Sequence, residues 1–205
     1  MFDFLLDLIF PRLCIGCGQA GRFFCLKCRK TIRFYSGQIN PQYFNYEGLD
    51  GVFVLAHYDG IIRQAIKEIK YRGKFAICQE LAEMIIQNYN QKFLFNYLVP
   101  VPLSNKRQKD RGFNQAEKLA QYLKFAPVLN YLERTRDTKP QFDLKLDELK
   151  ENVKNAFALK QKLPAGNFCL VDDVATTGAT LSECAKVLKK AGAPKVYAIC
   201  VARGG

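Results

Sequence analysis

The sequence predicts an α/β fold in which helices flank a parallel sheet, preceded by a small four-cysteine module. Short apolar runs typical of buried strands alternate with segments whose apolar residues recur at helical spacing. Four cysteines gather in two close pairs near the amino terminus. The length of 205 residues suits one α/β domain with a small appendage, so we place the module at residues 1–45 and the domain at residues 46–205.

The alternation of strands and helices continues along the whole domain. Strands are expected at residues 52–58, 98–102, 168–171 and 195–201. Helices are expected at residues 61–71, 75–89, 113–123 and 181–191. Residues 134–140 are polar and aperiodic and residues 141–157 are mixed and in part helical, so we interpret this stretch as a candidate lid. Parallel sheets of this kind bind ligands at the carboxyl ends of their strands.

The strongest functional signal begins at the third expected strand. Its apolar run is followed by two acids, by a loop rich in threonine and glycine, and then by a helical pattern. A helix N-terminus and a glycine suit a phosphate monoester, because free backbone N–H groups and the helix dipole favour an anion. Adjacent carboxylates can accept hydrogen bonds from vicinal sugar hydroxyls. The residues predicted to hold a ribose and its 5'-phosphate are Asp172, Asp173, Val174, Ala175, Thr176, Thr177, Gly178, Ala179 and Thr180.

The eleven residues from Leu170 to Thr180 resemble the signature of the type I phosphoribosyltransferases, which bind 5-phosphoribosyl 1-pyrophosphate (PRPP). The resemblance implies a type I phosphoribosyltransferase-like sheet, with Asp172 and Asp173 as the catalytic acids. An ordinary strand–turn–helix whose acids cap the helix is the alternative, and the combined pattern disfavours it. Some purine-salvage members have a carboxylate where this chain has Thr176, so the resemblance disfavours purine salvage and leaves other acceptors open.

The amino-terminal cysteines form a C-x2-C-x7-C-x2-C set, namely Cys14, Cys17, Cys25 and Cys28. Two such knuckles bring four thiolates into a tetrahedral site, and zinc is the expected occupant in a reducing compartment. That compartment disfavours disulfides, and the spacing favours zinc over an iron–sulfur cluster. Because four sulfur ligands leave no open coordination position, the predicted Zn2+ is structural.

The charge balance indicates an anionic partner. The chain has 31 Lys and Arg residues against 19 Asp and Glu residues, a formal net charge of +12. Nucleic acid, a polyphosphate ligand and a membrane surface all fit this excess, and so do simply solvated lysines. Basic and aromatic residues interleave around the cysteine module, as suits single-stranded nucleic acid, although we interpret the phenylalanines as the core of the module.

A basic stretch at residues 104–111 follows the second expected strand and precedes a helix. We predict a loop there that cradles an anion, since a basic loop at a strand end and a helix N-terminus suits pyrophosphate. A solvated basic loop is the alternative when this stretch is considered alone. The residues predicted to bind pyrophosphate, or alternatively the phosphates of single-stranded DNA, are Lys106, Arg107, Lys109 and Arg111.

Other features are interpreted as structural. His57, the only histidine, is assigned a structural instead of a catalytic role. No segment has the length of a transmembrane helix, and residues 1–10 are interpreted as a short amphipathic helix and not as a signal peptide. We therefore expect a cytoplasmic protein without a membrane span, with a peripheral contact at the inner face of the cell membrane as an alternative. The cysteines expected to be small buried apolar residues are Cys78, Cys169, Cys184 and Cys200.

The whole chain is similar to the ComF family of competence-associated proteins, phosphoribosyltransferase-like domains with an amino-terminal cysteine knuckle. After the cysteine set, the blocks that carry the resemblance are residues 58–60, 66–67, 70–71, 99–102, 111–115, 134, 138, 140–141, 152–157 and 172–180. The resemblance implies binding of PRPP or a related phosphoribosyl ligand with Mg2+, a zinc knuckle, and a role in natural transformation. Its implied partners are incoming single-stranded DNA, a helicase-like competence protein and the recombination machinery.

Two residues depart from the family pattern. The family commonly has an arginine where this chain has Leu149, with Lys150 next to it. If that arginine holds pyrophosphate, the clamp is weaker here or Lys150 replaces it. The family often has glycine where this chain has Asn155, and we expect little effect because asparagine tolerates left-handed backbone.

Three functions are compatible with these observations. The first is a competence factor that binds PRPP-like ligands and handles single-stranded DNA. The second is an orphan phosphoribosyltransferase that acts on an unknown acceptor, and the third is a regulator that senses PRPP without chemistry. Catalysis and sensing need the same phosphate loop, so the pattern favours neither. The sequence lacks a Gly-x4-Gly-Lys-Ser/Thr motif, which disfavours an intrinsic ATP-driven motor of that type.

Overall fold

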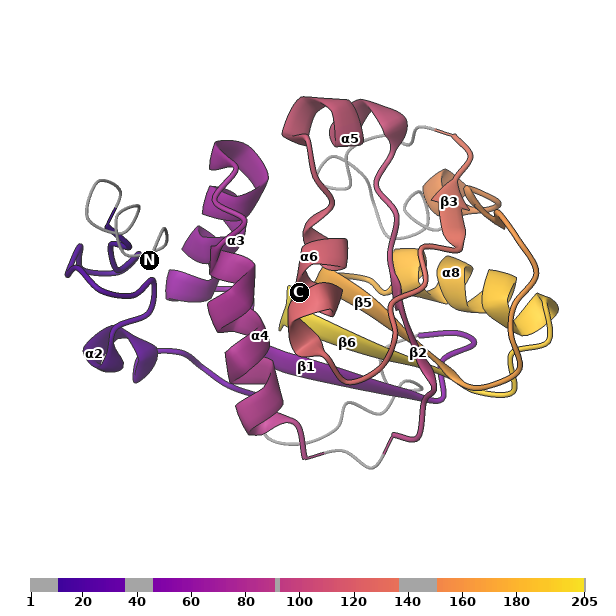
Figure 1. The fold of residues 1–205 in the computed structure, drawn as a ribbon, viewed down its shortest axis with the longest axis horizontal. Helices are drawn as coiled ribbons and strands as arrows, with labels where there is room; N and C mark the ends of the chain where they lie inside the picture. Colours follow the sequence, from indigo (N-terminus) through magenta and orange to yellow (C-terminus); the bar gives the residue numbers. More distant parts are fainter. Residues whose placement is uncertain (1–10, 36–45, 91–92, 137–150, 205) are drawn as a thin grey trace.

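A computed structural model describes residues 11–35, 46–90, 93–136 and 151–204 (Figure 1). Its centre is a four-stranded sheet in the order β1-β6-β5-β2, and every neighbouring pair of strands is parallel. The strands are β1 (Gly51–His57), β2 (Tyr97–Pro100), β5 (Phe168–Ala175) and β6 (Val196–Arg203). All four lie where the sequence predicts strands, which confirms the parallel α/β sheet.

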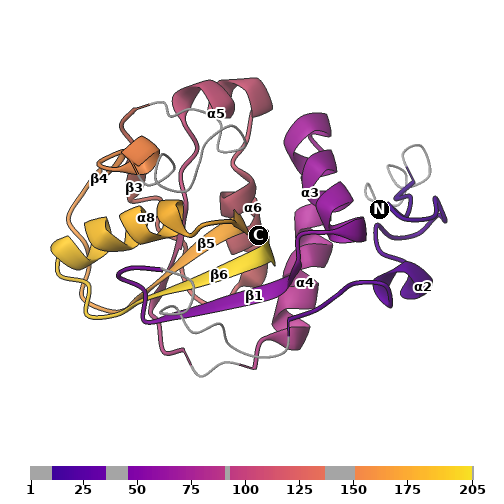
Figure 2. The same cartoon turned by 180° about the vertical axis from the view of Figure 1, so that it is seen from behind.

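Helices cover both faces of this sheet (Figures 1 and 2). Three of them pack on one face: α3 (Gly60–Arg72), α4 (Ile77–Asn88) and α6 (Gln115–Leu123). The opposite face is covered by α8 (Ala179–Lys190). Each of these helices lies within two residues of its predicted bounds, so apolar periodicity was a sufficient guide to them.

The sheet is buried on both faces because its strands are almost wholly apolar. Along β5, Cys169 and Val171 pack with α3, α4 and α6, whereas Phe168 and Leu170 pack with α8. The predicted burial of the unpaired cysteines is confirmed for Cys78, Cys169, Cys184 and Cys200.

The basic segment after β2 is a helix, so the prediction of a loop there is wrong. The helix α5 (Asn105–Arg111) begins at Ser104, whose hydroxyl accepts a hydrogen bond from the Arg107 N–H at 3.4 Å. It ends at Gly112, which adopts a left-handed φ of 74°. Because α5 buries none of its residues, its sequence lacks the apolar periodicity by which a helix is detected.

A small antiparallel sheet is absent from the sequence-based prediction. It pairs β3 (Leu132–Arg134) with β4 (Phe157–Leu159), and strands of three residues are too short to show an alternating pattern. Most of the candidate lid, residues 137–150, lies outside the described residues, and its last residue begins a strand. Asn155 has a left-handed φ of 54°, which confirms that asparagine takes such a backbone conformation here.

The cysteine module packs onto the domain and shares its core. The module contains the short helix α2 (Leu26–Arg29), and its Phe23 and Phe24 join the same apolar cluster as α3 and α4. The core role predicted for the module's aromatic residues is thereby confirmed for these two. The carboxylate of Glu80 on α4 accepts hydrogen bonds from the backbone N–H groups of Phe23 at 2.8 Å and Phe24 at 3.0 Å. Two hydrogen bonds from backbone N–H groups to a carboxylate thus attach the module to the domain, directly before the third cysteine of the module.

The chain leaves the module along the edge of the sheet. Phe34 forms an antiparallel bridge with Ala56 of β1, and the next residue, Tyr35, stacks its ring on His57 with centroids 4.1 Å apart. This stacking fits the structural role assigned to His57. The domain boundary at residues 45 and 46 stays a prediction, because residues 36–45 lie outside the described part of the chain, as do residues 1–10. Among the described helices, none has the length and apolar character needed to cross a bilayer.

Candidate functional site

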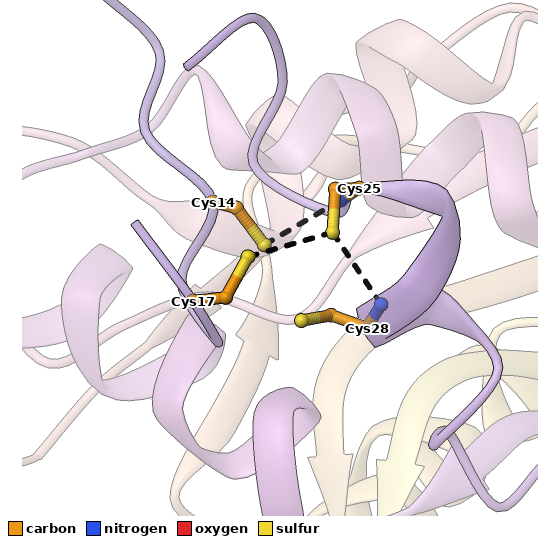
Figure 3. A group of neighbouring side chains, drawn as sticks. All are labelled: Cys14, Cys17, Cys25 and Cys28. Atoms are coloured by element: carbon orange, nitrogen blue, oxygen red, sulfur yellow. Dashed lines mark hydrogen bonds between the residues drawn. The ribbon is translucent and has the colours of Figure 1, made fainter. Parts of the chain in front are cut away.

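The four predicted zinc ligands converge in space (Figure 3). The sulfur atoms of Cys14, Cys17, Cys25 and Cys28 all lie within 4.8 Å of one another, and those of Cys17 and Cys25 are 3.6 Å apart. A tetrahedral zinc with Zn–S bonds of ~2.3 Å needs its sulfur ligands ~3.8 Å apart. The cluster therefore fits a metal such as zinc in both donor type and spacing.

Backbone N–H groups support the sulfur cluster. The N–H of Cys25 donates to the Cys14 sulfur at 3.5 Å, and the N–H of Cys28 donates to the Cys25 sulfur at 3.4 Å (Figure 3). Burial opposes ionisation of Cys14, but the backbone donors of Cys25, Cys17 and Gly16 outweigh it and lower the pKa of Cys14 to about 6. The hydrogen bond with the Cys25 sulfur and burial instead raise the pKa of Cys28 to about 12. The folded chain without a metal thus favours the thiolate at Cys14, and a metal would have to displace the proton of Cys28.

The cysteine cluster also touches the start of α3 at a position that requires glycine. A Cβ added at Gly16 would lie 2.9 Å from the Cys28 sulfur and 3.1 Å from Cδ1 of Ile61. Such contacts leave no space for a side chain, so the knuckle approaches the domain with bare backbone.

A second polar site lies at the carboxyl ends of β5 and β2. It is a cavity of about 370 Å³ that brings together the acidic pair, the threonine–glycine loop and basic residues from three other elements. A larger cavity of about 700 Å³, between α8 and β4, contains none of the predicted site residues. The charged residues that line the smaller cavity are Lys70, Arg107, Arg111, Arg134, Asp172 and Asp173.

The two acids lie inside β5 and not after its end. The strand continues to Ala175, which pairs with Arg203 of β6, so the expectation that it stops before Asp172 is wrong. Successive residues of a strand point to opposite faces of the sheet. On the α3 side, the Asp173 carboxylate forms an ion pair with the Lys70 ammonium group at 2.7 Å. Both side chains are mostly buried, with 9% and 20% of their surface exposed.

Burial and the charges of this ion pair together shift the pKa values of Lys70 and Asp172. Burial opposes the charge on Lys70, but the neighbouring Asp173 outweighs it and raises the pKa of Lys70 above its ordinary value. Burial and the Asp173 charge raise the pKa of Asp172 to about 8, which the more distant Lys70 only partly offsets. Two adjacent carboxylates share one lysine, so one of them is held in its neutral form near neutral pH.

The loop after β5 has the geometry of an anion-binding turn. Gly178 is the N-cap of α8 and adopts a left-handed φ of 79°, a conformation that glycine allows without strain. Thr176, Gly178, Ala179 and Thr180 line the cavity. The hydroxyl of Thr177 instead accepts a hydrogen bond from the Ala179 N–H at 3.4 Å. The start of α8 therefore faces the cavity with its dipole and backbone donors.

The helical form of α5 divides the four predicted basic residues between two environments. Arg107 and Arg111, one turn apart, line the cavity, whereas Lys106 and Lys109 are exposed on the helix surface. The Arg111 guanidinium donates to the Gln115 side chain at 3.1 Å, and burial lowers the pKa of Arg111 from its ordinary value. The structure thus brings the two arginines to the cavity together with the acidic pair and leaves the two lysines outside it.

Sequence reasoning missed functional roles for several residues on the cavity wall. Lys70 and Tyr71 at the end of α3, Tyr58 after β1, and Arg134 of β3 all line the cavity. Each of them falls in a block that resembles the ComF pattern, and that was the available signal. Their roles were hidden because they depend on the close approach of elements that are far apart in the chain.

The chain is similar to several bacterial competence and DNA utilization proteins. No family model matches the sequence. Competence protein F of Haemophilus influenzae is 31% identical over 206 residues, which cover 93% of this chain and 90% of that protein. DNA utilization protein YhgH of Escherichia coli K12 is 30% identical over 164 residues, covering 73% of this chain and 70% of that protein. Competence protein ComFC of Bacillus subtilis is 29% identical over 66% of this chain and 56% of that protein.

Among solved structures, the chain is similar to a purine phosphoribosyltransferase from Pyrococcus horikoshii Ot3. The match covers 74% of this chain and 78% of that chain, with 18% sequence identity and a TM-score of 0.34. The fold and the cavity define an α/β protein with a polar cavity at the carboxyl ends of parallel strands and a separate four-cysteine module. The sequence identity to these relatives, over most of the length of each protein, shows that the chain belongs to the ComF family of competence-associated proteins.

Proposed function

We propose that this protein is a competence protein that binds PRPP, or a related phosphoribosyl ligand, with Mg2+ and handles incoming single-stranded DNA in the cytoplasm. The observation that carries the proposal is that the acidic pair, the threonine–glycine loop and the arginines of α5 all line the same cavity. The relatives named as competence and DNA utilization proteins support the DNA part. A helicase-like competence protein and the recombination machinery are the protein partners that we propose on the same grounds.

Each part of a phosphoribosyl ligand has matching chemistry on the cavity wall. The loop from Thr176 to Thr180 would hold the 5'-phosphate through backbone N–H groups and hydroxyls. Asp172 and Asp173 would accept hydrogen bonds from the ribose hydroxyls. Arg107 and Arg111 would bind the pyrophosphate, since guanidinium groups pair well with phosphate oxygens.

The acidic pair also suits the proposed Mg2+. Magnesium prefers oxygen ligands and is commonly held by one or two carboxylates together with substrate phosphates. Asp172 and Asp173 provide such carboxylates beside the arginines that would hold the phosphates. When bound, Mg2+ would neutralise negative charge that develops on pyrophosphate. The Lys70 charge keeps the acids from repelling a polyanionic ligand.

Calorimetry with PRPP and Mg2+ tests the ligand part of the proposal. We expect wild-type protein to bind, and Asp172→Asn and Asp173→Asn variants to lose at least about tenfold in affinity. Glu83→Gln is the control, because Glu83 is an exposed acid on α4 outside the cavity. The absence of binding to zinc-loaded, folded wild-type protein would contradict the proposal.

Phosphoribosyl transfer is a second candidate function, favoured by the arginines that lie beside the acidic pair. In that reaction the bond from C1 of the ribose to pyrophosphate breaks, a bond from C1 to the acceptor forms, and the acceptor loses a proton. Thr176 offers no carboxylate to take that proton, which disfavours purine acceptors and leaves other acceptors open. Release of pyrophosphate that depends on an added base, nucleoside or DNA end would establish transfer, whereas tight binding without release would favour a PRPP-sensing regulator.

An exposed aromatic and basic surface beside the cavity supports the handling of single-stranded DNA. Tyr71 lines the cavity yet is 69% exposed, and Phe75 is 46% exposed with the Lys118 ammonium group 5.6 Å from its ring centroid. Lys106 and Lys109 are exposed on α5. Unpaired bases stack on such rings while lysines attract the phosphates, whereas paired bases have no free face.

Fluorescence titration with a labelled single strand tests the DNA part. We expect Tyr71→Ala to weaken binding and Tyr71→Phe to preserve it, because the phenylalanine ring still stacks. Replacing Lys106 and Lys109 by glutamine should reduce the salt dependence by a log–log slope of about 0.7 per lost contact. The charge-matched control replaces Lys162 and Lys195, which are exposed and do not line the cavity. Equal effects in both lysine pairs would contradict this surface.

A further inference from the structure

A buried tyrosine lies directly against the glycine of the anion-binding loop. Tyr46 is 3% exposed, and a Cβ added at Gly178 would overlap Cδ1 and Cε1 of its ring. The ring therefore occupies the space that a side chain at this position would need. Gly178 is required here for two reasons, its left-handed φ of 79° and the close approach of Tyr46.

The end of β6 lies near Tyr46. Arg203 of this strand pairs with Ala175 in the sheet, immediately before the loop begins. Burial opposes the charge on Arg203, but the nearby hydroxyls of Tyr35 and Tyr46 outweigh it and raise the pKa of Arg203. The ring of Tyr46 also belongs to the apolar cluster beneath α8, which contains Ala179 and Leu181. The Tyr46 ring thus connects the loop at Gly178 to the apolar cluster beneath α8.

We propose that Tyr46 is a positioning residue of the phosphate site, which sets the loop around Gly178 and thereby aims the backbone N–H groups at the start of α8. The role as a phosphate-site residue rests on the proposed function, whereas the support given to the loop does not depend on any ligand. Backbone N–H groups bind an anion best when their directions are fixed before binding. A flexible loop must lose conformational freedom when the ligand binds, and this loss lowers the affinity. A rigid ring that fills one side of the loop removes that cost.

The first experiment divides the ligand into its two anionic parts. Calorimetry compares ribose 5-phosphate with Mg2+-pyrophosphate on wild-type protein and on Tyr46→Leu and Tyr46→Phe variants. We expect Tyr46→Leu to lose about tenfold or more in affinity for ribose 5-phosphate, with pyrophosphate affinity unchanged. Tyr46→Phe should retain most of the affinity, because the supporting ring remains. Equal losses for both ligands, or none for ribose 5-phosphate, would overturn the proposal.

The second experiment reports on the loop without a ligand. Amide hydrogen exchange should accelerate selectively in residues 176–182 of Tyr46→Leu, while the strands keep their protection. Tyr89→Leu is the matched control, since Tyr89 packs on the opposite face of the sheet and its loss should leave loop exchange unchanged. Unchanged loop exchange in folded Tyr46→Leu would refute the support role. If loop exchange rises but wild-type protein binds neither ligand, the proposed function fails and the support of the loop by Tyr46 stands.

Discussion

The cysteine cluster and the strand-end cavity are both polar sites built by short sequence motifs, but the protein surrounds them differently. In the cysteine cluster, four sulfur atoms face one another and backbone N–H groups point at sulfur. Cys14 and Cys25 are buried, Cys28 is half-buried and Cys17 is exposed. The cavity is open, and charges of both signs line its wall. This difference is the one we expect if the first site serves stability and the second binds the proposed ligand reversibly.

Removal of the metal should therefore have the largest effect on stability. The loss of structure should be confined to the cysteine module. Structural zinc contributes about 10–16 kcal/mol to the folding of small zinc modules. We expect Cys25→Ser or a strong chelator to release zinc and unfold the module, with loss of the contacts that Phe23 and Phe24 make with Glu80. Metal analysis and amide exchange across residues 11–35 would measure this, and a chelated module that keeps its protection would contradict the assignment.

Loss of Lys70 should have the next largest effect. Removing one partner of a buried ion pair costs roughly 3–5 kcal/mol, and the 20% exposure of the Lys70 side chain places the expected cost at the lower end. Lys70→Met leaves the acidic pair without its cation, so denaturant unfolding should show a clear loss. The double variant Lys70→Met, Asp173→Asn should recover much of it, because the uncompensated charge is gone. A double variant that is as unstable as the sum of the single variants would contradict the pairing.

The sequence predicted the parts of both regions that depend on local pattern. Apolar runs located the strands because a sheet covered on both faces must be apolar throughout. The spacing of the cysteines located the metal ligands because each knuckle is a local turn. Lys70 escaped functional assignment because its partner, Asp173, is reached only after the chain has folded back across the sheet. The role of Tyr46 could not be predicted, because the sequence around a tyrosine before a strand does not indicate whether its ring contacts a loop glycine.

Alanine substitutions at the two glycines that flank α8 can isolate the effect of the Tyr46 ring on stability. Gly178 and Gly192 flank the helix, and both adopt positive φ, but a Cβ at Gly192 would meet open space. Substitution by alanine at either position costs about 1–2 kcal/mol for the left-handed backbone. At Gly178 the overlap with the ring should add about 1–3 kcal/mol. Denaturant unfolding of Gly178→Ala and Gly192→Ala measures the difference, and equal losses would mean that the ring yields freely.

The smallest expected effect, counted per pH unit, is a pH dependence of stability that arises at Asp172 in the cavity. Burial and the Asp173 charge raise the pKa of Asp172 to about 8, far above the value of ~3.9 in an unfolded chain. Between these values the folded state binds more protons than the unfolded state, so stability falls as pH rises, by at most about 1.4 kcal/mol per pH unit. Binding of Mg2+ to the ionised acid should change in the opposite direction and strengthen toward pH 8.

Asp172→Asn provides the control for this pH dependence, because asparagine cannot titrate. Denaturant unfolding between pH 6 and pH 8 should show a shallower decline in the variant than in the wild type, whose decline includes the Asp172 contribution. The cysteine cluster must be kept loaded with zinc throughout, since thiolate ligands add their own proton dependence. Identical slopes in the two proteins would mean that Asp172 is already ionised near neutral pH, and the acids would then be poised for a cation before any ligand arrives.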